Sequence, residues 1–284
     1  MNKKKTSVLV FFILSLVVFI ASPIIRNTAF CDAETHPRII SLSPVITEWL
    51  YLLGLENSVA GVTTYCNKPS RAKNKDKIGT VLEVNVEKIM GLNPDVVFAM
   101  SLTNTKDLKK LKSMGINVIT FDIPKDFEKL CEVSLRVGSA VGKENEARNI
   151  VKTSKMKVYD IKKKTAQRPK QKVFVQIGAK PLFAATHEFF VNDYIELAGG
   201  INIFKEAMSG LISREEVLKR NPDVILIATM GISGKDEMRT WQKYKTINAV
   251  KQNRIYIVDP DTMCSPTPVS FAGYLEEIAG IVQK

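Results

Sequence analysis

KENEARNIVKTSKMKVYDIKKKTAQ, residues 143–167, is a continuous helical pattern with no strand signal inside it. It follows Gly138 and Gly142 and stops before Pro169, which closes it. At 1.5 Å per residue, 25 residues span roughly 37 Å, enough to connect two halves of a protein. We therefore predict a spacer helix between two halves. Because periodicity alone does not say what a helix packs against, a long helix lying on a single sheet is the alternative.

Short apolar segments rich in Val and Ile alternate with helical segments on both sides of this stretch. Segments that are apolar throughout are typical of parallel strands buried on both faces. The predicted strands are Arg38–Leu42, Val59–Val62, Val96–Ala99, Asn117–Phe121, Val173–Ile177, Val224–Ala228 and Ile255–Val258. The predicted helices are Val45–Leu53, Val86–Gly91, Lys106–Met114, Arg214–Arg220 and Val269–Val282. This alternation predicts an α/β architecture with right-handed crossovers.

The two halves contain the same unit. Glu87–Asp95, EKIMGLNPD, lines up with Glu215–Asp223, EEVLKRNPD, 128 residues later. Each copy is a short helix, an Asn-Pro-Asp turn and then an apolar strand, and proline ends the helix because it disfavours a helical residue before it. A weaker match pairs Asn117–Asp122 with Arg254–Asp259. Two matches in the same order on both sides of a long helix indicate an internal repeat.

The beginning of the chain has the composition of a secretory signal. Lys3, Lys4 and Lys5 precede an apolar segment, Val8–Ala21, which is too short for a comfortable membrane span. We predict a signal peptide at residues 1–33, cleaved after Ala33. A lipid-modified Cys31 is the second possibility and an uncleaved anchor the third. The rest is predicted to divide into an N-terminal lobe at residues 37–142, a bridging helix at 143–168 and a C-terminal lobe at 169–284.

The chain is basic, with a formal net charge of +12. Removing residues 1–33 takes away four cations and one anion, so the net charge falls by 3 to +9. Many lysines fall on the polar faces of helices and no nucleic-acid motif is present, so we expect a solvated surface and no nucleic-acid partner.

The cysteines that follow the signal do not form a disulfide framework or a zinc site. Cys66, Cys131 and Cys264 are odd in number, and their spacing matches no zinc site. One bridge, Cys66 to Cys264, is possible, and three free thiols are the alternative.

Sequence motifs of catalysis are absent. A hydrolase would need a nucleophile, a base and an orienting acid, yet the only histidines are His36 and His187. There is no Gly-x-Ser-x-Gly motif, no phosphate-binding glycine loop and no dinucleotide fingerprint. We therefore expect a protein that is not an enzyme and carries no cofactor or resident metal; an exported α/β enzyme is the alternative from another class.

An ordered series of motifs covers residues 37–284. The N-terminal half contains RIISLSPVITE (38–48), GVTTYCNKP (61–69) and IGT (78–80). The C-terminal half contains KVFVQIGAKPLF (172–183), LAGGINIF (197–204) and ISREEVL (212–218). This series resembles the periplasmic binding proteins for iron complexes and vitamin B12, the solute receptors of type II ABC importers. Its motifs are most similar to those of the cobalamin-binding branch.

The resemblance implies two Rossmann-like lobes with parallel sheets, joined by a single long α-helix, with the ligand between them. It further implies a monomer in the periplasm or on the outer face of the inner membrane. The ligand would be a metal chelate, with a corrinoid favoured, and the partners would be a permease and its ATPase subunits. The cobalamin branch tends to place tryptophans where this chain has Val81 and Ser209. A ferric siderophore or haem is therefore the alternative ligand.

Candidate ligand-binding residues lie in the loops after the predicted strands, because ligands of such sheets bind beyond the carboxyl ends of the strands. Tyr65 leads, since its ring could stack on a flat macrocycle while its hydroxyl forms a hydrogen bond. The full set is Ser43, Pro44, Tyr65, Val81, Leu82, Phe183, His187, Asp259 and Met263.

Two glutamates are candidates for docking on the permease. In the family that the chain resembles, one acidic residue on each lobe pairs with arginines of the permease. The internal repeat puts Glu87 and Glu215 at equivalent positions, one in each half. Each also opens a short helix, where a carboxylate suits the positive end of the helix dipole, and this capping role is the alternative.

Overall fold

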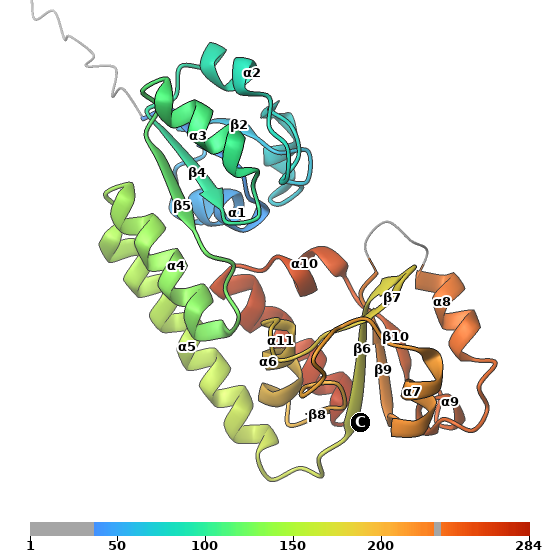
Figure 1. Cartoon of the computed structure of the whole chain (residues 1–284). Helices are drawn as coiled ribbons and strands as arrows, with labels where there is room; N and C mark the ends of the chain where they lie inside the picture. The colour runs from blue at the N-terminus through green and yellow to red at the C-terminus, as the bar shows by residue number, and fades with distance from the viewer. Residues whose placement is uncertain (1–36, 230–233) are drawn as a thin grey trace, which may run out of the picture. The chain divides into compact units, whose positions relative to one another are not determined.

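The computed structural model describes residues 37–229 and 234–284 (Figure 1). The predicted signal peptide, residues 1–33, lies outside the described residues. No helix within the described ranges is both long and apolar enough to cross a membrane.

The N-terminal half is built on a parallel sheet of five strands in the order β3-β2-β1-β4-β5. The strands are β1 (Ile39–Ser41), β2 (Val59–Val62), β3 (Asp76–Lys77), β4 (Val96–Met100) and β5 (Val118–Phe121). β1 and β4 are buried along their whole length, as their apolar sequences predict.

The C-terminal half has a second, separate sheet in the order β10-β9-β6-β7, with β8 paired to β6. Its strands are β6 (Lys172–Ala179), β7 (Leu182–Ala184), β8 (Ile201–Asn202), β9 (Val224–Ile227) and β10 (Ile255–Ile257). All pairs are parallel except β6 with β7, which form an antiparallel hairpin. The predicted α/β class with two sheets is confirmed, and the single-sheet alternative is wrong.

The helices lie between the strands, mostly where the sequence places them. They are α1 (Pro44–Leu52), α2 (Val86–Gly91), α3 (Thr105–Ser113), α4 (Phe127–Ala140), α5 (Glu144–Thr165), α6 (Val191–Leu197), α7 (Arg214–Arg220), α8 (Gly234–Trp241), α9 (Asn248–Lys251), α10 (Pro260–Cys264) and α11 (Pro268–Val282), with a 3-10 turn at Ser70–Asn74. The elements absent from the sequence prediction are β3, β7, β8, α4, α6, α8, α9 and α10.

The repeated Asn-Pro-Asp turn has the same geometry in both halves. The asparagines after α2 and α7, Asn93 and Asn221, adopt left-handed backbone angles with φ of 44° and 48°. The aspartates then accept a hydrogen bond from the backbone at the start of the neighbouring central strand: Arg38 N to Asp95 Oδ2 at 2.7 Å and Lys172 N to Asp223 Oδ2 at 2.9 Å. The repeat therefore encodes how each helix returns to its sheet.

Helix α5 is one unbroken helix of 22 residues, roughly 33 Å long at 1.5 Å per residue. It is not an isolated rod, because α4 and α11 pack along it (Figure 1). One hydrophobic core contains residues of both halves. Within the N-terminal half, Trp49 of α1 donates a hydrogen bond to the Ser134 carbonyl of α4 at 2.8 Å. Phe271 of α11 stacks between Phe127 of α4 and Tyr194 of α6, at 4.7 and 4.1 Å between ring centroids. The lobe boundaries at residues 142 and 169 stay predictions.

The three cysteines of the described chain are free thiols. Cys66 and Cys131 are buried, and burial raises the pKa of the Cys131 thiol to about 12. The possible Cys66–Cys264 bridge is therefore not present.

A glycine-to-alanine pair tests the packing of α4 on α5. A Cβ at Gly138 would overlap the Cβ of Ala147, so Gly138→Ala should destabilise the fold by about 1–3 kcal/mol through overpacking. Gly273 of α11 is the control: a Cβ there meets nothing within 4 Å, and Gly273→Ala should stabilise by about 0.5–1 kcal/mol because glycine is a poor helix former. Urea denaturation of both variants measures the two effects, and equal effects would contradict the packing argument.

Candidate functional site

A cavity of about 350 Å³ lies beyond the carboxyl ends of the strands of the first sheet. Each of these strands leads into it. Its lining comes from the β1–α1 junction (Ser43, Pro44, Val45), the loops after β2 and β3 (Tyr65, Val81, Leu82), β4 and the loop that follows it (Met100, Leu102), and the segment from β5 into α4 (Ile123, Pro124, Leu130). The C-terminal half adds Phe190, Cys264, Ser265 and Pro266.

The cavity is apolar, and no charged side chain lines it among the described residues. Four large apolar side chains in it are about half exposed: Tyr65 (52%), Leu82 (55%), Leu102 (51%) and Ile123 (46%). Exposed apolar side chains that gather in one hollow mark a binding surface rather than ordinary surface scatter.

The residue after Tyr65 is anchored in the core, and this anchoring leaves Tyr65 at the tip of its turn. Cys66 is fully buried, with its Sγ 3.1 Å from Thr63 Oγ1 and 3.1 Å from Thr47 Oγ1. The backbone N–H of Cys66 donates to the Thr63 carbonyl at 3.1 Å, which closes a tight turn after β2. The turn therefore holds Tyr65 at its tip with the ring at the cavity.

The loop that carries Val81 and Leu82 is also held by backbone hydrogen bonds. Thr80 N–H donates to the Glu83 carbonyl at 2.7 Å, and Asn104 N–H donates to the Leu82 carbonyl at 2.9 Å. Gly79 enters this loop with φ of 120°, where a Cβ would overlap the Glu83 carbonyl oxygen. The cavity wall is therefore largely pre-formed.

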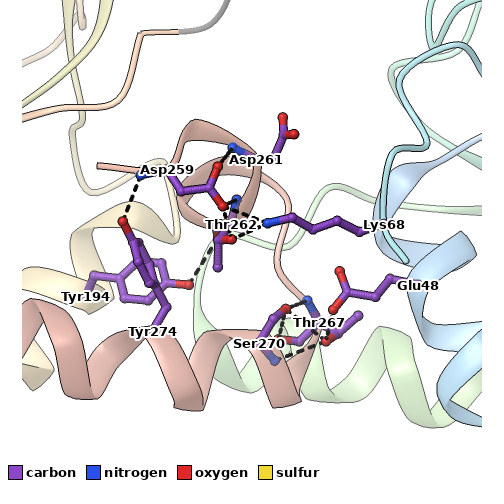
Figure 2. Close-up of polar contacts among 9 residues, drawn as sticks. All are labelled: Glu48, Lys68, Tyr194, Asp259, Asp261, Thr262, Thr267, Ser270 and Tyr274. Carbon is purple, nitrogen blue, oxygen red and sulfur yellow. Dashed lines mark hydrogen bonds and ion pairs between the residues drawn. The ribbon is translucent and has the colours of Figure 1, made fainter. Parts of the chain in front are cut away.

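Two polar contacts join the halves beside the cavity (Figure 2). Lys68, from the loop that carries Tyr65, donates to Asp259 Oδ2 at 2.7 Å and also contacts the Thr262 hydroxyl. Glu48 of α1 accepts a hydrogen bond from Thr267 Oγ1 at 3.2 Å. Asp259 caps α10, and its backbone N–H donates to the Tyr274 hydroxyl at 2.8 Å. We name the contact of Lys68 with Asp259 and Thr262 the Lys68 bridge.

The two carboxyls near this bridge are shifted in opposite directions. Burial of the Asp259 carboxyl favours a higher pKa, but hydrogen bonds from Lys68 and Thr262 outweigh burial, and the pKa lies below its ordinary value. Burial raises the pKa of Glu48, despite hydrogen bonds from Ser270 and Thr267 and the charge of Lys68. The Lys68 ammonium thus favours both carboxylates.

The structure brings five of the nine predicted ligand-binding residues together in the cavity: Ser43, Pro44, Tyr65, Val81 and Leu82. The other four lie elsewhere. Phe183 packs edge-on against Phe189, at 5.9 Å between centroids. His187 Nδ1 lies 2.8 Å from the Lys205 carbonyl oxygen. Asp259 belongs to the Lys68 bridge, and Met263 is fully buried in the core.

Several lining residues were not singled out from the sequence. Met100, Leu102, Cys264, Ser265 and Pro266 lie at the ends of predicted strands or in the loops after them, so strand-end position was a usable signal. Leu130 and Phe190 lie in or beside helices that the sequence analysis did not predict, and no signal identified them. Within residues 37–229 and 234–284, no group of three or more His, Cys, Asp or Glu side chains could hold a metal ion.

Glu87 and Glu215 occupy equivalent places in the first turns of α2 and α7. Both side chains are exposed, and neither takes part in an ion pair with any other described residue. The caps of these helices are Asn85 and the Ser213–Glu216 capping box, and the place of each glutamate at the positive end of its helix stays the alternative to a docking role. Hydrogen bonds from its own backbone and from Ser213 lower the pKa of Glu215, which keeps it ionised.

Comparison with known proteins gives consistent results. Residues 39–262 match the model of the periplasmic binding protein family. An uncharacterised ABC transporter substrate-binding lipoprotein of Bacillus subtilis, YvrC, is 34% identical over 252 residues, which cover 85% of this chain and 78% of that protein. A vitamin B12-binding protein of Vibrio cholerae is 25% identical over 234 residues, covering 81% of this chain and 84% of the relative.

The fold agrees with that of a solved relative. The crystal structure of a possible iron-binding, periplasmic solute-binding protein from Staphylococcus epidermidis superposes with a TM-score of 0.77 at 28% identity, over 88% of this chain and all of that one. Since the family model covers most of the chain and a relative above 30% identity spans 85% of it, the chain belongs to the periplasmic binding protein family.

Proposed function

We propose that this protein is the extracytoplasmic substrate-binding component of an ABC importer, and that it captures a metal chelate and delivers it to the permease. The observation that carries the proposal is the pre-formed apolar cavity with half-exposed Tyr65, Leu82, Leu102 and Ile123, in a chain of this family. Broad apolar contact with a few polar groups is the usual way in which proteins hold such ligands.

Binding without chemistry fits the side chains of the cavity. Its only thiol is Cys264, whose pKa burial raises to about 11, so the sulfur stays protonated and is a weak nucleophile. His187, the one histidine of the described chain, does not line the cavity. ATP would be consumed by the partner ATPase subunits.

A corrinoid is the favoured ligand. Tyr65 presents an aromatic face and a hydroxyl at the cavity, which suits a flat macrocycle with polar edges. The relative from Vibrio cholerae, a vitamin B12-binding protein, supports this choice. A ferric siderophore or haem is the alternative, and the possible iron-binding protein of Staphylococcus epidermidis supports that class.

The Lys68 bridge would hold the cavity closed on one side. It connects the loop that carries Tyr65 to α10, and the residues at the end of α10, Cys264–Pro266, line the same cavity. Because the pair is about half exposed, its net contribution to stability is modest, on the order of 1 kcal/mol or less. Such a contact can open for ligand exchange.

Delivery would use the exposed Glu87 and Glu215 as matched anchors, one in each half, on arginines of the permease. The receptor would act as a monomer outside the cytoplasm. The lipoprotein relative from Bacillus subtilis favours a membrane-anchored form with the lipid on Cys31.

Tyr65→Ala tests the ligand site. Loss of the ring should raise the Kd for the true ligand about tenfold, equivalent to about 1.4 kcal/mol. Tyr159→Ala on α5 is the control, because Tyr159 is 64% exposed but lies outside the cavity. The purified protein is titrated with cobinamide, cobalamin, haem and a ferric siderophore, followed by tryptophan fluorescence and visible spectra. If the parent protein binds none of these four ligands, the proposed function is contradicted.

Lys68→Met tests the bridge. Without the ammonium, burial of Asp259 is no longer outweighed, so the pKa of Asp259 should rise, and that of Glu48 should rise further. In the native protein the depressed pKa of Asp259 gives stability that is present above its unfolded pKa and is lost as the pH falls through the folded one. The variant should lose this acid-dependent component. Carboxyl NMR titration measures the pKa values, and an unchanged Asp259 would rule the bridge out.

Reversing both anchor charges tests delivery. The double variant Glu87→Arg, Glu215→Arg should abolish uptake in cells while the purified protein keeps its ligand affinity, because both side chains lie outside the cavity. Glu206→Arg, Glu277→Arg changes the charge equally at two other exposed glutamates and should transport normally. Normal uptake by the first variant would exclude the anchor role.

A further inference from the structure

A dense group of cations lies where α5 ends and β6 begins. Six of the eleven residues 162–172 are Lys or Arg, and none is Asp or Glu. Their side chains are all exposed, and none makes an ion pair with another residue in the described ranges. The cations are Lys162, Lys163, Lys164, Arg168, Lys170 and Lys172, and we name them the basic patch.

Helix capping explains only part of this patch. Lys162, Lys163 and Lys164 are in the last turn of α5, where cations suit the negative end of the helix dipole. Arg168, Lys170 and Lys172 come after the helix and gain nothing from it. The patch as a whole is therefore more than a helix end.

Hydrogen bonds hold the backbone beneath the patch, and the cationic side chains are exposed. Thr165 is buried, and its hydroxyl lies 3.1 Å from the Leu197 carbonyl oxygen of α6. Lys172 N–H donates to Asp223 Oδ2 at 2.9 Å. Six exposed positive charges are thus concentrated on a rigid support, and their combined positive potential would attract an anionic partner.

An apolar side chain lies next to the cations. Ile201 of β8 is 46% exposed and is in parallel register with Lys172 of β6. A cationic surface with an exposed aliphatic side chain is the composition of segments that sit at the headgroup boundary of anionic membranes.

The patch lies at the amino end of β6 in the second sheet, whereas the cavity lies beyond the carboxyl ends of the strands of the first sheet. Lys172 is the first residue of β6, whereas the cavity residues follow the last residues of β1, β2, β4 and β5. The loop from α5 into β6 lies beside β8, away from α10 (Figure 1). Contact through the basic patch would leave the cavity uncovered.

We propose that the basic patch, with Ile201, docks the protein on an anionic phospholipid bilayer. Charge complementarity and the exposed Ile201 favour lipid over nucleic acid, because no aromatic side chain for base stacking occurs in residues 162–172. The docking goes beyond the proposed function and does not depend on which ligand the cavity holds. A membrane-resting receptor would keep its ligand site accessible.

Vesicle sedimentation tests the proposal on the chain without residues 1–33, so that neither the apolar segment nor a lipid on Cys31 contributes. Residues 36–284 form one compact unit, so this form should fold. It should bind phosphatidylcholine vesicles that contain phosphatidylglycerol, and not phosphatidylcholine alone. High salt should release it, since the Debye length falls to about 3 Å at 1 M.

Matched variants locate the surface. Lys163→Gln, Lys164→Gln, Arg168→Gln, Lys170→Gln should lower the partition coefficient at least about tenfold. The control Lys106→Gln, Lys109→Gln, Lys110→Gln, Lys112→Gln removes the same charge from exposed lysines of α3 and should bind almost as the parent does. Ile201→Ser should weaken binding without any change of charge.

Three outcomes would overturn the proposal. No binding of the parent protein to phosphatidylglycerol vesicles excludes the docking. Equal weakening of the two lysine variants assigns binding to net charge alone. Equal affinity for soluble polyphosphate, with no effect of Ile201→Ser, assigns the patch to polyanions in general. A failed ligand titration with intact vesicle binding would count against the proposed function only.

Discussion

The close approach of α4 to α5 is the constraint on which the rest of the structure depends. Gly138 leaves no room for a side chain against Ala147, so the two antiparallel helices lie nearly in contact. Through this pair the core of the first sheet continues into that of the second: Trp49 bonds to α4, while α11 packs along α5 and stacks Phe271 on Phe127. Interiors packed this densely transmit strain. Movement between the halves should therefore be small, and the cavity should be largely pre-formed.

Because the helical core is rigid, the contacts most able to change are the few that join the two halves beside the cavity. The Lys68 bridge is half exposed and of modest energy, whereas the contacts of Phe271 with Phe127 and Tyr194 are buried. The Lys68 bridge, which is the weaker contact, lies beside the cavity. The stronger contacts of Phe271 lie between the helices. Since low-stability contacts open first, exchange of ligand should disturb the loop of Tyr65 and the start of α10 before it disturbs the core.

The sequence predicted the elements whose signals are local. Apolar runs identified the longer strands, and the Asn-Pro-Asp turn identified the ends of α2 and α7 within a residue. The sequence does not predict helix α4, because Gly138 and Gly142 both resemble helix-boundary signals. In the structure Gly138 lies inside α4 as a packing residue, and only Gly142, with φ of 70°, ends a turn. Tertiary packing overrode the local preference of glycine.

The same distinction explains the site. Tyr65, Val81 and Leu82 follow parallel strands and line one cavity, as strand-end position predicts; that they bind ligand stays a prediction. The prediction that Phe183 and His187 lie in the same site requires an open loop after β6. Instead β6 turns back as the β6–β7 hairpin, which carries Phe183 onto Phe189 and Gly210, and the turn after it seats His187 on Lys205. Whether a strand is followed by an antiparallel hairpin partner depends on pairing between two segments, which the sequence of one segment does not reveal.

The direction of the strands determines where the two proposed docking surfaces lie. In both sheets α2 and α7 run back against their strands, so the first turns that carry Glu87 and Glu215 lie on the side of the carboxyl ends, as the cavity does. The Asn-Pro-Asp turn fixes this relation twice, through Asp95 and Asp223. The basic patch lies at the opposite end because β6 starts there. Under the two proposals, a permease that engages both glutamates meets the cavity side of the protein, while an anionic bilayer meets the amino end of β6.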